Sequence, residues 1–209
     1  RNELGGTGAL DLYSAGLRGA GLWSETVDWE AEMVFQAGRL AARPVRAFGG
    51  VWVLGWQSGK QRWQPRLSGS YTYASGDNHP RDGVKGTFDT LYPNTHLRNG
   101  ATDRIGWANI HDALLQGDWK ASRKLKLSAG AHDFRLATTE DALYSPGGAA
   151  LMRNARASSG HVGFELFTAA DYALSRTLSL GAGCAHLFRG AFLRESGRGG
   201  VTQPYVFLT

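Results

Sequence analysis

The stretch VDWEAEMVFQAG at residues 27–38 decides the fold, because the character of its side chains alternates from one residue to the next. A period of two is the pattern of a β-strand with one apolar face and one polar face. The stretch is also close in length to the ~9–11 residues of a tilted membrane-spanning strand. Its apolar face carries Val27, Trp29, Ala31, Met33, Phe35 and Ala37, and its other face carries Asp28, Glu30, Glu32, Val34, Gln36 and Gly38.

The same pattern recurs along the chain and predicts an all-β fold. In 63–74 and 106–119, small and apolar residues again alternate with polar ones. Segment 45–56 is apolar on both faces, so its orientation stays open. The predicted strands are 9–20, 27–38, 45–56, 63–74, 106–119, 124–137, 160–173, 177–189 and 202–209.

The links between these strands alternate strictly between short and long from the third link onward. Outer-membrane barrels have short periplasmic turns and long extracellular loops, whereas a soluble sandwich has no reason to keep its long loops at one end. The pattern predicts an antiparallel up-and-down transmembrane β-barrel. With the C-terminus in the periplasm, the external links are 39–44, 76–105, 138–159 and 190–201, and the others, 21–26, 57–62, 120–123 and 174–176, are periplasmic.

The strand count and the two ends predict that residues 1–209 are part of a larger barrel domain. An odd count of nine strands, with the first entering from outside, breaks the even-number rule of bacterial single-chain barrels. The sequence starts at Arg1 and stops at YVFLT, without the terminal aromatic residue that such barrels usually carry. We therefore expect missing strands before Arg1 and a few missing residues at the C-terminus.

The amino-acid composition is typical of a protein with many strands whose backbones approach one another closely. The chain has 29 glycines, 6 prolines and 11% aromatic residues, and no apolar run approaches the ~18 residues of a membrane helix. Cys184 is the only cysteine, so the chain cannot form an internal disulfide. Cys184 is expected to pack as a small apolar residue. A formal net charge of +5 suits anionic partners such as lipopolysaccharide or an acidic polysaccharide. The basic residues are scattered without a nucleic-acid motif, so no nucleic-acid partner is expected.

The segment ASGDNHPRDGVKGTFDTLYPNTH, which begins at Ala74, resembles a long loop of the alginate-export family of outer-membrane porins. The resemblance continues through WANIHDALLQGDWKASRKLKLSAGAHDF, RLATTEDALY, the region of Gly163 to Glu165, and PYVFLT. Upstream, YSAGLRG and VDWEAEMVFQAGR are similar to earlier strands of that family, whereas 130–135 departs from its pattern. The resemblance implies a barrel of about eighteen strands, wide enough for a channel. It also implies transport of polysaccharide or smaller solutes without energy input.

Charged side chains on the lumen face are the candidate solute-binding residues, because they bias which ions or sugars enter a pore. The alternative is that they only solvate the lumen and pair across strands. Arg135 has the opposite parity to its neighbours but is kept as a candidate. The candidates are Arg18, Glu30, Glu32, Arg66, Asp112, Lys126, Arg135 and Glu165, with Asp28 and Asp118 on the same face.

No catalytic, cofactor or metal site is expected. The oxygen-rich link 76–105 leaves cation binding open, but its Asp, Asn and Gly residues are ordinary turn formers and its spacing is not that of an EF-hand. The histidines His111, His132, His161 and His186 do not stand in a Ser–His–acid order that would indicate a hydrolase. An aromatic girdle is expected from Trp23, Trp29, Trp63, Trp119 and Tyr172.

The function expected is a passive outer-membrane channel for an anionic, alginate-like polysaccharide or a related solute. A porin for another small anionic or sugar solute, and a non-conducting structural or adhesin barrel, are the alternatives. Its expected partners are outer-membrane lipid, lipopolysaccharide and the barrel-assembly machinery. The lipid-facing surface is expected to carry Trp29, Met33, Phe35, Leu115, Leu127, Leu180 and Leu208.

Overall fold

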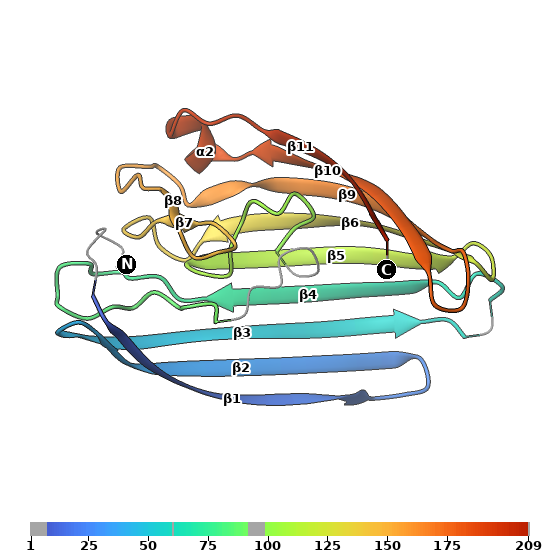
Figure 1. The fold of residues 1–209 in the computed structure, drawn as a ribbon, viewed down its shortest axis with the longest axis horizontal. Helices are drawn as coiled ribbons and strands as arrows, with labels where there is room; N and C mark the ends of the chain where they lie inside the picture. The colour runs from blue at the N-terminus through green and yellow to red at the C-terminus, as the bar shows by residue number, and fades with distance from the viewer. Residues whose placement is uncertain (1–7, 60, 92–98, 209) are drawn as a thin grey trace.

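A computed structural model describes residues 8–59, 61–91 and 99–208 and contains one large antiparallel sheet. Its nine strands follow one another in chain order, each paired with the next (Figure 1). They are β1 (Leu10–Leu22), β2 (Val27–Leu40), β3 (Arg43–Gln57), β4 (Arg66–Ala74), β5 (Ile110–Lys120), β6 (Leu125–Leu136), β9 (His161–Ala173), β10 (Ser179–Arg189) and β11 (Val201–Leu208). The links contain β7 (Leu143–Tyr144), β8 (Ala150–Met152) and the short helix α2 (Ala191–Glu195).

Every predicted strand has a counterpart, so the all-β antiparallel class is confirmed. Two strands, β4 and β5, begin three and four residues later than predicted. Before β4, Gln64 has a φ of 40°, a left-handed conformation that ends the extended backbone. Before β5, Asn109 has a φ of 50° and its side-chain amide donates to the carbonyls of Thr138 and Ala142. Both residues belong to turns that precede the ladder.

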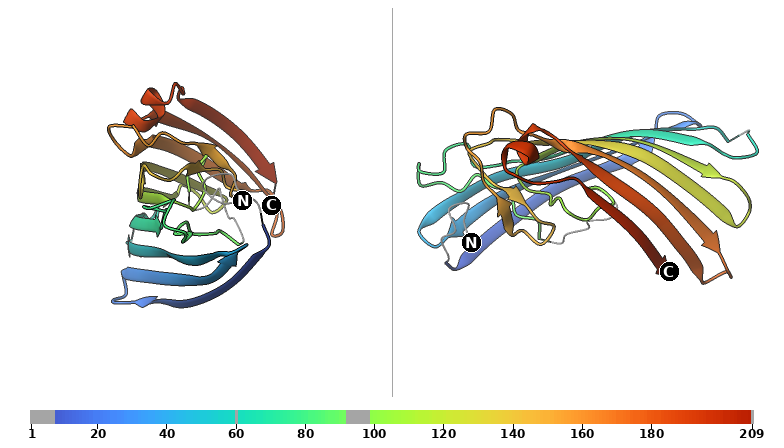
Figure 2. Two further views of the ribbon diagram at one scale, coloured as in Figure 1. Left: turned by 90° about the vertical axis from the view of Figure 1, so that its left-hand side faces the viewer. Right: turned by 90° about the horizontal axis from the view of Figure 1, so that it is seen from above.

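The sheet is curved (Figure 2), and the residues on its two faces differ in chemistry. Cross-strand partners lie on the same face, and the register places Leu115 with Gly69 and Ala131, and Leu180 with Leu208. The predicted outward set shares the convex face, which confirms that expectation. Segment 45–56, whose orientation was open, turns Phe48, Trp52, Leu54 and Trp56 outward and Val45, Ala47 and Val51 inward.

The convex face exposes large apolar side chains over its whole width. Leu17 on β1 is 76% exposed, Leu115 on β5 is 58% exposed, and Leu208 on β11 is 65% exposed. Burial of apolar surface is worth roughly 25 cal/mol per Å², and water-soluble monomers rarely carry contiguous apolar patches beyond a few hundred Å². A convex face of this kind fits a hydrocarbon environment.

The two ends of the sheet differ in their links, as predicted. The short links 23–26, 58–65, 121–124 and 174–178 gather at one end, and the long links 75–109, 137–160 and 190–200 gather at the other (Figure 1). The short-link end also carries exposed aromatic rings, namely Trp23, Trp63, Trp119 and Tyr172, where a girdle at a membrane boundary is expected.

The first and last strands of the sheet do not pair with each other within the described residues. The sheet is therefore open between β1 and β11, as the sequence predicts (Figure 2). None of the helices among the described residues is long and apolar enough to cross a membrane.

Candidate functional site

The described parts of the link between β4 and β5, residues 75–91 and 99–109, fold back over the concave face of the sheet and are together called the crossing segment below (Figure 2). On one side it reaches β2, where the Gln36 side chain donates to the carbonyl of Asp89 at 2.7 Å and accepts from its N–H at 2.8 Å. On the other side it reaches β9, where the Glu165 carboxylate accepts the N–H of Ala101 at 2.6 Å. Since β2 and β9 flank the strands β3 to β6, the described parts of the crossing segment contact the concave face on both sides of these four strands.

Glu165 is a fully buried anchor for this segment. Besides Ala101, it accepts the hydroxyl of Thr102 at 2.5 Å and the N–H of Thr102 at 3.3 Å. A Cβ at Gly100 would lie 2.9 Å from both carboxylate oxygens, and Gly100 has a φ of 89°. Only glycine therefore lets the backbone approach the carboxylate in this way. Charge-assisted hydrogen bonds to a buried carboxylate are strong, which fixes the segment to β9.

A second buried pair lies in the wall beside Glu165. His132 Nδ1 is 2.8 Å from Asp112 Oδ1, and both side chains are buried. In the register of the sheet, His132 stands opposite Glu165. The three side chains therefore form one buried polar row across β5, β6 and β9. Such groups stay buried because each has a partner.

The crossing segment is also tied to the neighbouring link 137–160 through Asp141. The Asp141 carboxylate accepts the N–H of Asp77 at 2.9 Å, and the hydroxyls of Thr87 and Tyr144, each at 2.6 Å. Burial and the nearby Asp141 charge raise the pKa of Tyr144 well above its ordinary value. The phenol therefore stays protonated at physiological pH and remains a donor to Asp141.

Apolar side chains fill the space between these links and the concave wall. Phe88 and Ile105 of the crossing segment pack with Phe134 of β6, and Phe192 and Leu193 of α2 join the same cluster. The core of the protein thus lies at the long-link end, under the inward-folded links. The links are held by packing as well as by hydrogen bonds, so they form part of the fold.

The remaining concave surface, toward the short-link end, carries charges that pair across strands. Arg66 of β4 holds Asp28 of β2 in a bidentate pair, with distances of 2.7 and 3.3 Å. Arg18 of β1 lies 3.2 Å from Glu30 of β2. Asp118 stands opposite Arg66 in the register. This surface therefore presents both signs of charge next to one another.

The sequence-predicted lumen residues divide into two groups on the concave face. Arg18, Glu30, Glu32, Arg66 and Lys126 line the accessible part, and in the register Lys126 stands opposite Asp171. Asp112 and Glu165 point to the same side but are 1% and 0% exposed. Their surroundings give these two carboxylates a structural role, in contrast to the expected contact with solute.

The assignment of Arg135 to the lumen is corrected by the structure. β6 keeps its period of two, so Phe134 points inward and is buried while Arg135 points outward. Arg135 Nε lies 2.9 Å from Asp133 on the convex face, and Asp133 also contacts His161 at 2.8 Å. This cluster lies at the long-link end of the convex face, where polar headgroups are expected to begin.

The turn interpretation of the crossing segment is supported by its aspartates. Asp77 accepts the N–H of His79, and Asp82 accepts the N–H of Val84, which are local turn bonds. Within the part of the chain that the structure describes, no group of three His, Cys, Asp or Glu side chains is arranged to hold a metal ion. His96, which lies in the link 76–105 considered for cation binding, is outside the described residues.

Gln36, Asn109 and Asp141 were not singled out from the sequence, although each anchors a link. Their partners are distant along the chain: Gln36 and Asp89 are separated by 53 positions, and Asp141 and Asp77 by 64. No local spacing marks such residues. For Gln36, the only signal in the sequence is a polar side chain at an inward-facing strand position. Ser68 and Thr72 are also polar residues at such positions, so this signal does not single out Gln36.

Comparison with known proteins gives one family. The family model described as "Alginate export" matches residues 1–208, which include the whole sheet, the crossing segment and the other long links. No curated protein matches the chain.

Proposed function

Because this chain belongs to the alginate export family, we propose that it forms the wall of a passive outer-membrane channel for an anionic, alginate-like polysaccharide. The observation that carries the proposal is the curved sheet itself, with an apolar convex face and a charged concave face. A barrel with this polarity places water inside and lipid outside. The chain acts by conduction and carries out no chemical step.

The paired charges of the accessible concave surface suit the passage of a polyanion. A pore must bind its solute strongly enough to admit it and weakly enough to release it. Arg18 and Arg66 supply cations, while Glu30 and Asp28 beside them limit the attraction that a passing carboxylate feels. Transient exchange of an arginine between its wall partner and a uronate carboxylate would then guide the polymer.

The open edges of the sheet support a barrel completed by further strands. An unpaired strand edge in hydrocarbon costs several kcal/mol for each unsatisfied backbone group. β1 and β11 each have one unpaired edge among the described residues. We propose that additional strands pair with both edges and that the closed barrel is wide, since ~16–18 strands leave an aqueous channel.

A porin for smaller acidic solutes is the second candidate, and the crossing segment favours it. This segment is fixed at both β2 and β9, so it narrows the passage permanently unless its anchors release. Blockade of single channels in a planar bilayer distinguishes the two candidates. A polymer channel is expected to be blocked by uronate oligomers added on one side and by no neutral glucan of equal length, whereas a small-solute porin conducts acidic monosaccharides and shows no oligomer blockade.

Charge reversal at two wall arginines is expected to change ion selectivity. In the full-length protein, Arg18→Glu with Arg66→Glu places new carboxylates beside Glu30 and Asp28, so anion over cation permeability should fall several-fold at low salt. The effect should shrink as salt rises, because screening shortens the range of the added charges. The reversal potential in a salt gradient measures this, and heat-modifiable gel mobility reports folding.

The matched control carries the same charge change outside the lumen. Arg123→Glu with Arg176→Glu alters exposed residues of the short links 121–124 and 174–178 and is expected to leave the reversal potential nearly unchanged. A native reversal potential in the folded Arg18 and Arg66 double variant would mean that these arginines do not set selectivity.

A further inference from the structure

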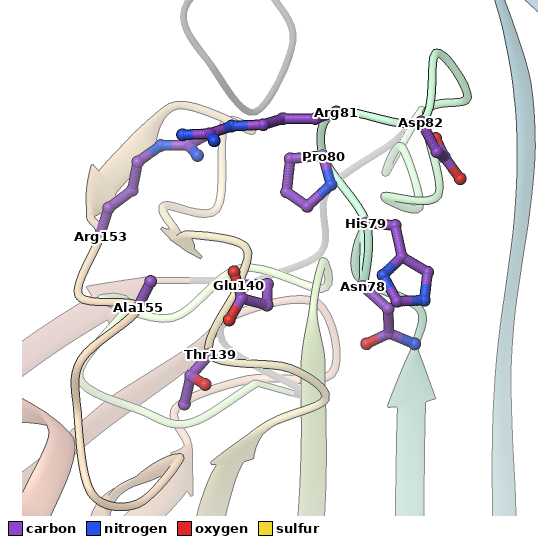
Figure 3. A pocket seen from close by; sticks show the side chains of 9 residues that line it. All are labelled: Asn78, His79, Pro80, Arg81, Asp82, Thr139, Glu140, Arg153 and Ala155. Atoms are coloured by element: carbon purple, nitrogen blue, oxygen red, sulfur yellow. The ribbon is translucent and has the colours of Figure 1, made fainter.

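A second polar site lies at the long-link end of the protein, away from the accessible concave wall. A pocket lies between the tip of the crossing segment and the link 137–160, and residues of both line it (Figure 3). Its volume of about 610 Å³ falls within the ~300–1,000 Å³ of small-molecule sites. Arg81 comes from the crossing segment, and Arg153 and Glu140 come from the other link.

Arg81 and Arg153 converge across this pocket. Figure 3 shows their side chains extending toward one another from the two links, and both side chains line the pocket. Among the described residues, neither guanidinium has an ion pair or a side-chain hydrogen bond. Two cations that point toward one another across a pocket repel each other, and a carboxylate placed between them would receive charge-assisted hydrogen bonds from both. The pair therefore has the form of an anion-binding site.

The backbone on both sides of the pocket is restrained, so this convergence is built into the fold. The tip around Arg81 is held by Arg43, whose Nη2 donates to the carbonyls of Pro80 at 3.2 Å and Val84 at 2.9 Å. On the other side, Arg153 directly follows β8, where Met152 pairs with Leu143 and packs against the core. A site of preorganised groups loses less entropy on binding.

The remainder of the pocket favours a sugar over a simple anion. Glu140 lies below the two guanidinium groups in Figure 3, and it forms no ion pair with either of them. Asn78 and Thr139 also line the pocket. A carboxylate, an amide and a hydroxyl are suitable partners for sugar hydroxyls, whereas the negative charge of Glu140 repels a compact anion such as phosphate.

From this arrangement we infer that the pocket binds one uronate unit of an acidic polysaccharide at the long-link mouth of the channel. The sugar carboxylate bridges Arg81 and Arg153, and its ring hydroxyls face Glu140 and Asn78. The inference rests on the proposed function for the identity of the polymer. It adds a docking site outside the barrel wall, where a chain is held before or after its passage.

Calorimetric titration of the full-length protein in detergent with a uronate trisaccharide tests the site. Replacing both arginines (Arg81→Gln with Arg153→Gln) is expected to weaken binding at least tenfold, because both carboxylate partners are lost. Arg156→Gln changes an exposed arginine of the same link outside the pocket and serves as the matched control, with native affinity expected. Equal affinity in the native protein and the double variant would overturn the inference.

Glu140→Gln separates a sugar site from a general anion site. Loss of its charge is expected to weaken binding of the uronate trisaccharide and to strengthen binding of inorganic phosphate. If phosphate binds the native protein as tightly as the trisaccharide does, the site is a general anion site and the sugar assignment is wrong. A neutral trisaccharide should not bind in either protein.

Single-channel recording of the same double variant separates this inference from the proposed function. Without oligosaccharide, its conductance is expected to equal that of the native protein, because both arginines lie outside the wall. If the native protein conducts and the double variant binds the trisaccharide with native affinity, the inferred site is wrong and the proposed channel is not contradicted. A protein that never conducts, but loses trisaccharide binding in the double variant, contradicts the proposed channel and supports the site.

Discussion

Deletion of residues 79–106 from the crossing segment, with a short Gly-Ser linker in their place, is expected to raise single-channel conductance several-fold. The described parts of the segment cover the concave face and contact Gln36 on β2 and Glu165 on β9, so removing them is expected to widen the passage. The deletion is compatible with the barrel, because β4 and β5 are direct neighbours and Ala74 stands opposite Ile110. Planar-bilayer recording of the full-length protein measures the change.

A matched control and a milder variant make this result interpretable. Replacing 147–149, the exposed part of the turn between β7 and β8, changes link residues away from the concave face and should leave conductance unchanged. Glu165→Ala removes the acceptor of Ala101 and Thr102 and should give a smaller, fluctuating increase by releasing one anchor only. Native conductance in both the deletion and Glu165→Ala, with normal heat-modifiable mobility, would show that the segment does not restrict the channel.

A charge at the centre of the convex face is expected to prevent assembly. Leu115 on β5 lies among small neighbours, opposite Gly69 and Ala131, with its side chain exposed. Arginine at the bilayer midplane of a barrel costs about 2–4 kcal/mol, which is a large share of the stability of a membrane fold. Leu115→Arg should therefore reduce the assembled fraction strongly in lipid vesicles, as read by heat-modifiable mobility and urea titration.

The control for this substitution lies one residue further along the same strand. Gln116 points to the concave face, where it donates to Asp118 at 2.9 Å. Gln116→Arg introduces the same side chain into the lumen beside a carboxylate and should assemble nearly as well as the native protein. Equal assembly of the two variants would remove the distinction between a lipid face and a water face.

The alternation in β2 and β5 predicted their faces from sequence, because a strand exposed to lipid on one side and water on the other must alternate. Segment 45–56 could not be oriented in this way. Its inward residues Val45 and Val51 are apolar because the inward-folded links cover that part of the concave face and exclude water from it. The apolar character of a strand thus depends on what packs over it, which is a property of distant residues.

The same reason limits how far the candidate site could be predicted. The carboxylates assigned to the lumen point to the concave side, but nothing local distinguishes Glu30, which contacts an arginine on the accessible wall, from Glu165, which is buried by Ala101 and Thr102. Arg135 was assigned to the lumen for its charge, against the parity of its strand. In the structure Arg135 points to the outward face, as the alternation of β6 predicts, since a single residue cannot change faces without breaking the ladder.

The most direct test of the account is the accessibility of two adjacent positions on β5 in the full-length protein, inserted into lipid vesicles. Cys184, which is exposed on the convex face, is first replaced by alanine. In this background, Gln116→Cys should react with a charged, water-soluble thiol reagent and lower the conductance. Leu115→Cys should resist that reagent, and a fluorophore attached there before insertion should be quenched by brominated lipid. Reaction of both cysteines with the charged reagent, or quenching at residue 116 in place of residue 115, would contradict a barrel wall with lipid outside and an aqueous channel inside.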